Sequence, residues 1–286
     1  MTPIRRPAIR SARILSLALG RALVRFNRKG GWVTSSHVGM SLLMALFPFL
    51  IFLTALAGAF TTELQADRLI ALVLSGWPEQ IADPIRAELA AVLAADNGGL
   101  ITLGGALALI FASNGVNAVR HALVRSYRGE DRRPLWHQRL LALIFVLVWA
   151  AVLFAVAMLE LGLPIYMELI GATARAGLLF SDDLPRQMLA LALLLFGVGA
   201  CHLWLPERRR SLSQIWPGIA LTVLLWAIAA ELFAIYVARY AEYSTTYAGL
   251  AGAMSALIFL YLMSAILILG AEMNGALDTI RSRQPD

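Results

Sequence analysis

Residues 216–238 read WPGIALTVLLWAIAAELFAIYVA, a stretch with one charged side chain, Glu231. At 1.5 Å per residue, a helix of this length crosses the ~30 Å hydrocarbon core of a bilayer. Five other stretches have the same character, and the whole chain is 59% hydrophobic and 15% charged. A soluble domain carries about 25% charged residues. The sequence therefore predicts an all-α integral membrane protein.

The hydropathy pattern predicts a bundle of six transmembrane helices. These spans are His37–Phe60, Gly98–Asn117, Gln138–Leu161, Gln187–Leu205, Trp216–Ala238 and Tyr247–Met273. They form a membrane domain over 37–273, preceded by a basic segment, 1–36, and followed by a tail, 274–286. The connection between the first two spans is expected to contain short extracytoplasmic helices at 64–74 and 84–95, which lie on the membrane or cap the bundle.

Basic residues are distributed unevenly between the two sides of this predicted bundle. The N-terminal segment, the second-to-third connection with the start of the third span, the fourth-to-fifth connection and the tail hold 19 of the 24 basic residues. Positive charge beside helix ends stays in the cytoplasm, so both termini are predicted to be cytoplasmic. A cleaved signal peptide is disfavoured, because the first apolar run is longer than an h-region and five further spans follow.

The first 36 residues hold eight basic residues and no acidic one. At 100° per residue, apolar side chains gather on one face of this segment and arginines on the opposite face. This predicts an amphipathic helix in the cytoplasmic interface, with its basic face toward anionic lipid headgroups. The alternative is an unstructured segment that only sets the topology. Membrane lipids are thus the expected partners, whereas the net charge of +6 does not by itself indicate nucleic acid.

Ionisable groups inside the bilayer are the default functional candidates, because a charge at that depth costs about 2.5–3.5 kcal/mol or more. Glu231 is the clearest substrate-pathway candidate, and we predict that it faces the bundle interior. Glu160 and Glu272 lie near span ends, where a solvated interfacial carboxylate is the alternative. Tyr243 and Tyr247 contribute either to a binding site or to an aromatic belt. Polar groups of spans three, five and six also predict a cavity around Glu231 in the outer half of the membrane.

A second polar group is expected at the inner end of span two. Asn114, Asn117 and Arg120 are spaced three residues apart, so they follow one side of a helix. Amides buried in lipid bond across helices, so the group either joins helices or contacts a substrate.

Two features of the predicted spans concern helix shape. Pro48 lies in the middle of span one and should kink that helix, because it removes a backbone hydrogen bond. In span six, Ala248, Gly252 and Ala256 repeat every four residues, which predicts a small-residue seam for close helix packing.

The sequence lacks the motifs of the common hydrolases and nucleotide-binding enzymes. There is no His-Glu-x-x-His zinc helix, no Gly-x-Ser-x-Gly elbow and no Walker A loop. The four histidines are scattered, and Cys201 beside His202 has poor spacing for metal ligands. We therefore predict no enzymatic activity, no cofactor and no metal site.

Several short stretches resemble one known family. They are 41–48 (SLLMALFP), 133–136 (RPLW), 216–218 (WPG), 243–247 (YSTTY), 260–261 (LY) and 269–274 (LGAEMN). Over about Phe26–Leu277 the chain resembles the YihY/BrkB family of bacterial inner-membrane proteins, once labelled ribonuclease BN. Ala248 departs from the family pattern. The resemblance implies six spans in the bacterial cytoplasmic (inner) membrane, and the ribonuclease label fits poorly because clustered His/Asp ligands are missing.

Two classes of function follow from these features. The first is transport or translocation of an amphipathic or lipidic envelope substrate, which the kinked first span, the rare buried polar groups and the basic helix favour. The second is a scaffold that holds envelope protein partners without transporting anything. An ion channel or a proton-coupled exchanger is a less favoured third alternative. A transporter should show a polar cavity at Glu231 or at the Asn114 side, whereas a scaffold should show a sealed bundle.

Overall fold

The computed structural model describes residues 7–58, 74, 78–79, 82–83, 85–86, 100–127, 131–157, 183–207, 210–240 and 248–282. Regular structure in these ranges is α-helical, which confirms the predicted all-α class. The helices are α1 (Pro7–Arg28), α2 (Gly31–Gly58), α5 (Leu100–Ser126), α6 (Leu135–Ala157), α9 (Asp183–Trp204), α10 (Leu212–Tyr240) and α11 (Ala248–Arg281).

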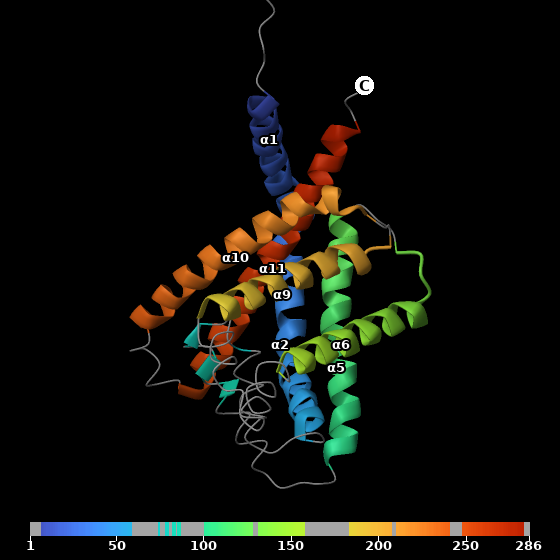
Figure 1. Ribbon diagram of the computed structural model, residues 1–286, viewed down its shortest axis with the longest axis vertical. Helices are drawn as coiled ribbons and strands as arrows, with labels where there is room; N and C mark the ends of the chain where they lie inside the picture. The colour runs from blue at the N-terminus through green and yellow to red at the C-terminus, as the bar shows by residue number, and fades with distance from the viewer. Residues whose placement is uncertain are drawn as a thin grey trace, which may run out of the picture.

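Two sets of helices cross in the structure (Figure 1). Helices α2, α5 and α11 run along the long axis, and α2 packs against both of the others. Helices α6, α9 and α10 lie obliquely across this set, and α10 packs on α11. The main core joins both sets through apolar side chains that include Val38, Leu123, Leu205, Ile215 and Ile268.

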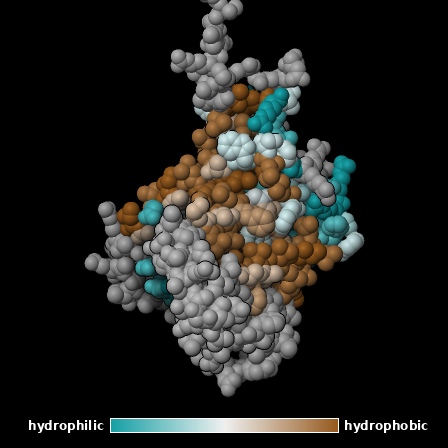
Figure 2. Space-filling model, in the orientation of Figure 1, coloured by the Kyte–Doolittle hydropathy of each residue, from teal (hydrophilic) through white to brown (hydrophobic). Residues whose placement is uncertain are grey.

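The surface of the described helices is that of a protein in a lipid environment. Helices α6, α10 and α11 are long and apolar enough to cross a membrane, and α9 contains the shorter apolar stretch Met188–Trp204. Large apolar side chains are exposed on α6, α9 and α10. Figure 2 shows the visible described surface as mostly hydrophobic, with hydrophilic residues toward its edges. Such an extensive apolar surface is a membrane-contact feature.

Several helices extend beyond the predicted spans. Helix α5 continues from the predicted end at Asn117 to Ser126, and α11 continues from Met273 to Arg281. Helix α10 begins at Leu212, so Pro217 lies inside the helix and not at its start. Hydropathy marks the apolar part of a helix, whereas backbone hydrogen bonding carries the helix on into polar sequence.

The N-terminal segment is helical and packs on the end of α11. Ala18 and Ala22 are buried against Ala276 and Leu277 of α11. Gly30, which has a positive φ of 67°, ends α1 and lets the chain turn directly into α2. One face of α1 is therefore occupied by protein, and its predicted position in the lipid interface stays a prediction.

Other shape predictions are met only in part. Helix α2 remains helical through Pro48, so the proline does not end it, and the predicted bend stays untested. Ala256 of the small-residue seam is buried beside Phe233 and Phe259, whereas the side chains of Ala248 and Gly252 are outside the described part of the structure. The same cluster includes Leu74, Ala82 and Ile85 of the connection between the first two spans.

Candidate functional site: a buried polar network beside a basic groove

A buried carboxylate joins α11 to the turn between α1 and α2. Glu272 is 1% exposed, and its two oxygens accept hydrogen bonds from Arg25 Nε and Lys29 Nζ, each at 2.7 Å. Both donors are charged, so these are strong ion-pair hydrogen bonds. The sequence left open a solvated interfacial carboxylate at this position, and that interpretation is wrong because the N-terminal segment folds over Glu272.

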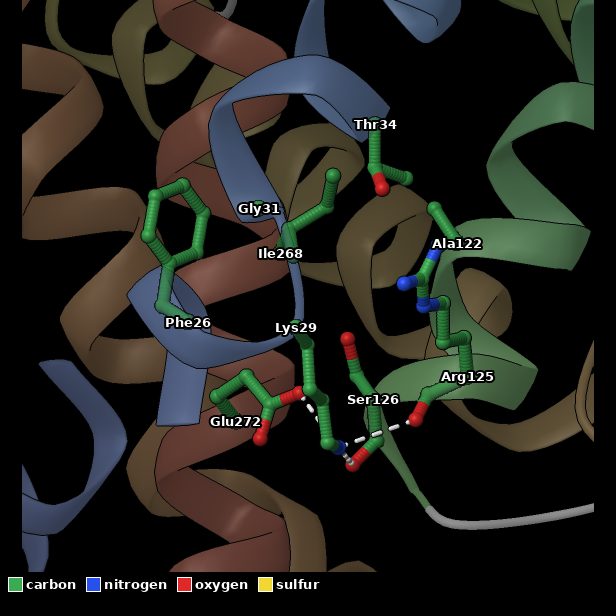
Figure 3. A pocket seen from close by; sticks show the side chains of 9 residues that line it. All are labelled: Phe26, Lys29, Gly31, Thr34, Ala122, Arg125, Ser126, Ile268 and Glu272. Atoms are coloured by element: carbon green, nitrogen blue, oxygen red, sulfur yellow. Dashed lines mark hydrogen bonds and ion pairs between the residues drawn. The ribbon is translucent and has the colours of Figure 1, made fainter. Parts of the chain in front are cut away.

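The same two cations bind the C-terminal end of α5. Arg25 Nη2 donates to the carbonyl of Ser126 at 2.9 Å, and Lys29 Nζ donates to the carbonyls of Arg125 and Ser126 at 3.0 and 3.1 Å. Figure 3 shows Lys29 between Glu272 and these carbonyl groups. The last carbonyls of a helix lack partners within the helix and carry partial negative charge. The two cations thus stabilise the end of α5 while they bind α11.

A small cavity of about 10 Å³ lies beside this ion pair, with Lys29, Arg125 and Glu272 in its wall (Figure 3). That volume is about the minimum that holds one water molecule. The cavity is therefore too small for a substrate.

A second buried group connects α11 with the first turns of α10. Asn274 is fully buried, and its Oδ1 accepts from the backbone N–H of Gly218 at 2.7 Å. Its Nδ2 donates to the carbonyl of Ile215 at 2.9 Å and to the Tyr127 hydroxyl at 3.1 Å. Pro217 lacks an N–H and disturbs the helix ladder at this point. The Asn274 amide therefore satisfies backbone groups on both sides of the proline.

The hydrogen-bond chain continues from α11 to α9. The Tyr127 hydroxyl lies 2.6 Å from His202 Nδ1, and both side chains are buried. Arg210 lies over the Tyr127 ring, 4.0 Å from its centroid, and also pairs with Asp278 of α11. Burial raises the pKa of Tyr127, so its hydroxyl remains protonated and available as a donor. Four helices meet at this hydroxyl and its neighbours.

Helices α10 and α11 approach each other closely at this level. A Cβ atom added to Gly218 would lie 2.2 Å from the Gly270 carbonyl oxygen, and one added to Gly270 would lie 2.1 Å from Thr222 Oγ1. Real Cβ atoms do not occupy such positions. Glycine is thus required on both helices for the Asn274 side chain to reach α10.

A third polar group surrounds Arg120, which is fully buried. Its guanidinium donates to Gln138 Oε1 at 2.6 Å and to Asn117 Oδ1 at 3.3 Å, and it pairs with Asp131 in the connection between α5 and α6. Asn114, in contrast, is exposed and accepts from Arg139 at 2.7 Å. Asn117 and Arg120 therefore lie on one side of α5, as predicted, and Arg120 holds the connection against the end of α5.

A groove of about 550 Å³ lies between α1 and α11. Arginines from α1 line it together with apolar side chains of both helices. The lining residues are Ser16, Leu17, Gly20, Arg21, Val24, Arg25, Arg28, Ala276 and Thr279. This lining holds positive charge and apolar surface side by side, and it contains no acidic residue.

The structure corrects the prediction for Glu231, whose side chain is exposed and does not face the bundle interior. Ala229 and Phe233 are the buried residues of this turn of α10. Glu231 lies two positions from each, which turns its side chain about 200° away from them. Glu160, Tyr243 and Tyr247 lie outside the described residues, so the cavity predicted around Glu231 at the outer ends of spans three and six stays a prediction.

Most members of the buried network were not predicted from the sequence. Arg25, Lys29 and Arg210 were counted among the basic residues that indicate topology, and Tyr127 and Asp278 had no predicted role. The stretches 216–218 and 269–274 gave a usable signal, because they contain Gly218, Gly270, Glu272 and Asn274. Among the described residues, no group of three or more His, Cys, Asp or Glu side chains is placed to hold a metal ion.

Comparisons with known proteins agree with this membrane architecture. The sequence model of the family described as "Virulence factor BrkB" matches residues 22–286. The ribonuclease-like protein YfkH of Bacillus subtilis is 30% identical over 92% of the chain and 95% of its own length. A UPF0761 membrane protein of Vibrio campbellii is 23% identical over 86% of the chain and 77% of its own length. No solved structure matches.

Proposed function

The chain belongs to the Virulence factor BrkB family of membrane proteins, and from this premise we propose that it translocates an anionic, amphipathic substrate of the cell envelope. The observation that carries the proposal is the groove between α1 and α11. An amphipathic substrate needs a charged contact for its head and an apolar contact for its tail. The groove offers both, with arginines beside Leu17 and Val24.

The proposed setting is the bacterial cytoplasmic (inner) membrane, crossed six times, with both termini in the cytoplasm. The separation of 19 basic residues from five supports this orientation. Reporters fused after Arg210 and Arg283 should report cytoplasm, and reporters fused near Asn97, Asp183 and Tyr243 should report the outside. A reproducible inversion at one of these sites contradicts the six-span topology.

Translocation is tested with purified protein in vesicles that contain a fluorescent phosphatidylglycerol. The assay measures the fraction of label that a membrane-impermeant quencher reaches, relative to protein-free vesicles. We expect this fraction to rise with the wild-type protein. An unchanged fraction argues against translocation of phospholipid and favours the scaffold function.

A matched pair of variants tests whether the groove is used. A Cβ added to Gly20, in the groove lining, meets no atom within 4 Å, so Gly20→Trp should fill the groove without disturbing the packing. Val33→Trp is the control, because Val33 is 76% exposed and lies outside the groove. We expect Gly20→Trp to slow translocation and Val33→Trp to leave it unchanged. Equal rates in both variants place the substrate elsewhere.

Glu231 remains a candidate on the substrate pathway, now as an exposed carboxylate of α10. Two variants are tested in a strain that depends on this protein. Glu231→Gln removes the charge and keeps the shape of the side chain, whereas Glu231→Leu removes the polar group as well. Loss of function at unchanged membrane abundance supports a working site. Full activity of Glu231→Leu removes the residue from the proposal.

A scaffold for envelope proteins is the second candidate, and the buried polar network favours it. Ion pairs and hydrogen bonds at Glu272 and Asn274 join α1, α5, α10 and α11 into one unit. Such a rigid end suits a docking platform. The vesicle assay distinguishes the two functions, because a purified scaffold does not translocate lipid.

A further inference from the structure

The arginines of the groove form one row along α1. Arg21, Arg25 and Arg28 follow one another at four and three residues, which is the spacing of neighbours on one side of a helix. The row covers about 10 Å of helix length, since each residue adds 1.5 Å. A guanidinium binds phosphate oxygens in a bidentate manner, so this row suits a phosphate group better than a diffuse negative charge.

Two of these cations are available for a ligand. Arg21 and Arg28 are exposed, and within the described part of the chain neither has an ion-pair partner. The acidic residues of α11 are Glu272 and Asp278, and both are already paired with other cations. The positive charge of Arg21 and Arg28 is therefore not neutralised by the neighbouring helix.

Arg25, in the middle of the row, is held in place by hydrogen bonds to α11 and to the end of α5. Its Nε and Nη2 atoms are bound by Glu272 and by the Ser126 carbonyl, while its Nη1 is buried and has no hydrogen-bond partner among the described groups. A buried donor without a partner is costly, and an anion is one way to satisfy it. Gly275 leaves room for this guanidinium, since an added Cβ would lie 2.8 Å from Arg25 Nη2.

The apolar part of the lining favours a phospholipid over other phosphate compounds. Leu17 and Val24 are 59% and 57% exposed and lie in the same groove as the arginines, with Ala276 on the facing helix. An acyl chain or glycerol backbone covers such apolar surface, whereas inorganic phosphate leaves it exposed to water. RNA is recognised by stacking on aromatic side chains, and the groove lining contains none.

We propose that this groove binds the phosphate group of an anionic phospholipid through Arg21 and Arg28, with its glycerol and acyl region on Leu17 and Val24. The inference rests on the proposed function, because it names the substrate class of the same groove. The bound lipid is one with a net negative headgroup, such as phosphatidylglycerol, and not a zwitterionic one.

Binding is measured with the purified full-length protein in a neutral detergent. The probes are short-chain phosphatidylglycerol, phosphatidylcholine with the same chains, inorganic phosphate and an RNA oligonucleotide. Each arginine near an anionic headgroup contributes about a fivefold factor in affinity, so Arg21→Gln with Arg28→Gln should weaken phosphatidylglycerol binding about 25-fold. The control is Arg132→Gln with Arg139→Gln, which removes the same charge outside the groove and should change binding less than about twofold.

Several results overturn the inference. They are equal binding of phosphatidylcholine, unchanged binding after loss of Arg21 and Arg28, binding of inorganic phosphate as tight as that of the lipid, and RNA binding that depends on the same two arginines. The assay does not require transport. If lipid binds as expected but vesicles show no translocation, the proposed function fails and the lipid site stands. If translocation occurs and the groove variant still binds lipid normally, the lipid site fails alone.

Discussion

Removal of the charge on Glu272 is the most direct test of the buried network. In Glu272→Gln the side chain keeps its shape but loses its negative charge, while Arg25 and Lys29 stay in place with side chains only 12% and 25% exposed. A hydrogen bond to a charged group contributes about 1.5–3 kcal/mol, and breaking a buried ion pair costs about 3–5 kcal/mol. The glutamine can still accept one hydrogen bond, and Lys29 is partly hydrated.

We therefore expect Glu272→Gln to lower the free energy of unfolding by about 3 kcal/mol. The loss is measured by equilibrium unfolding of the purified protein in mixed detergent and SDS micelles. Glu207→Gln is the matched control, because the Glu207 carboxylate accepts one exposed backbone hydrogen bond, from Arg132. The control should cost less than about 1 kcal/mol.

A double substitution separates an ion pair from a general packing defect. Lys29→Met alone leaves Glu272 with one cation, whereas in the Glu272→Gln background it removes a cation that has already lost its counter-ion. The second change should therefore cost clearly less in the Glu272→Gln background than in the wild type. A solvated Glu272 would give roughly 0–1 kcal/mol for Glu272→Gln and no coupling with Lys29. Either of these two results refutes the buried ion pair.

Three further predictions concern the other buried contacts, each measured by the same unfolding assay. Gly218→Ala should destabilise the protein by about 3 kcal/mol, because the added methyl group meets the Gly270 carbonyl. Gly20→Ala, with free space around the added methyl group, should stabilise it by about 0.5–1 kcal/mol. Equal effects of the two substitutions contradict the close approach of α10 and α11. Asn274→Leu should cost about 3 kcal/mol, since it leaves buried backbone groups of α10 unpaired, and a loss below about 1 kcal/mol contradicts that role. Burial raises the pKa of Tyr127 above its usual 10.0, so the stabilisation from its protonated hydroxyl is complete below pH 10 and is lost as the pH rises beyond it. Tyr127→Phe should therefore lose less stability above pH 10 than the wild type does. An identical loss contradicts the role of the buried Tyr127 hydroxyl.

The sequence predicted the helices of this protein well and their contacts poorly. The apolar stretches located α2, α5, α6, α9, α10 and α11, because a long apolar segment has few alternatives to a helix in lipid. The partners of Glu272 were not predictable in the same way. Arg25 lies 247 positions from Glu272 and Lys29 lies 243 positions away. Nothing local distinguishes these two cations from the other basic residues of the first 36.

Glu231 shows why the side of a helix is harder to predict than its position. The cost of a charge in lipid argued for an interior location, which is a sound general expectation. Helix α10, however, is apolar on nearly every side, so its sequence does not indicate which side meets α11. Ala229 and Phe233 are the buried residues here, and Phe233 packs on Ala256 and Phe259 of α11, which leaves Glu231 exposed.

Local spacing did identify part of the site. Asn117 and Arg120 lie on one side of α5, as their three-residue separation indicated, and this shared side allows the hydrogen bond between them. Asn114 continues the same row, yet it binds Arg139 of α6. Spacing along one helix thus predicts which residues lie together, and a second helix determines which of them pair.

The basic residues of the N-terminal segment have two distinct roles that a count of charges cannot separate. Positive charge near a helix end orients the protein whether or not it is paired later. After folding, Arg25 and Lys29 share one buried carboxylate, so two cations and one anion leave a local charge of about +1 that is directed toward the end of α5. Arg21 and Arg28 keep their full charge at the groove, because the acids of α11 are already paired. The same segment therefore fixes α1 to the bundle with two of its cations and presents two others to a negatively charged ligand.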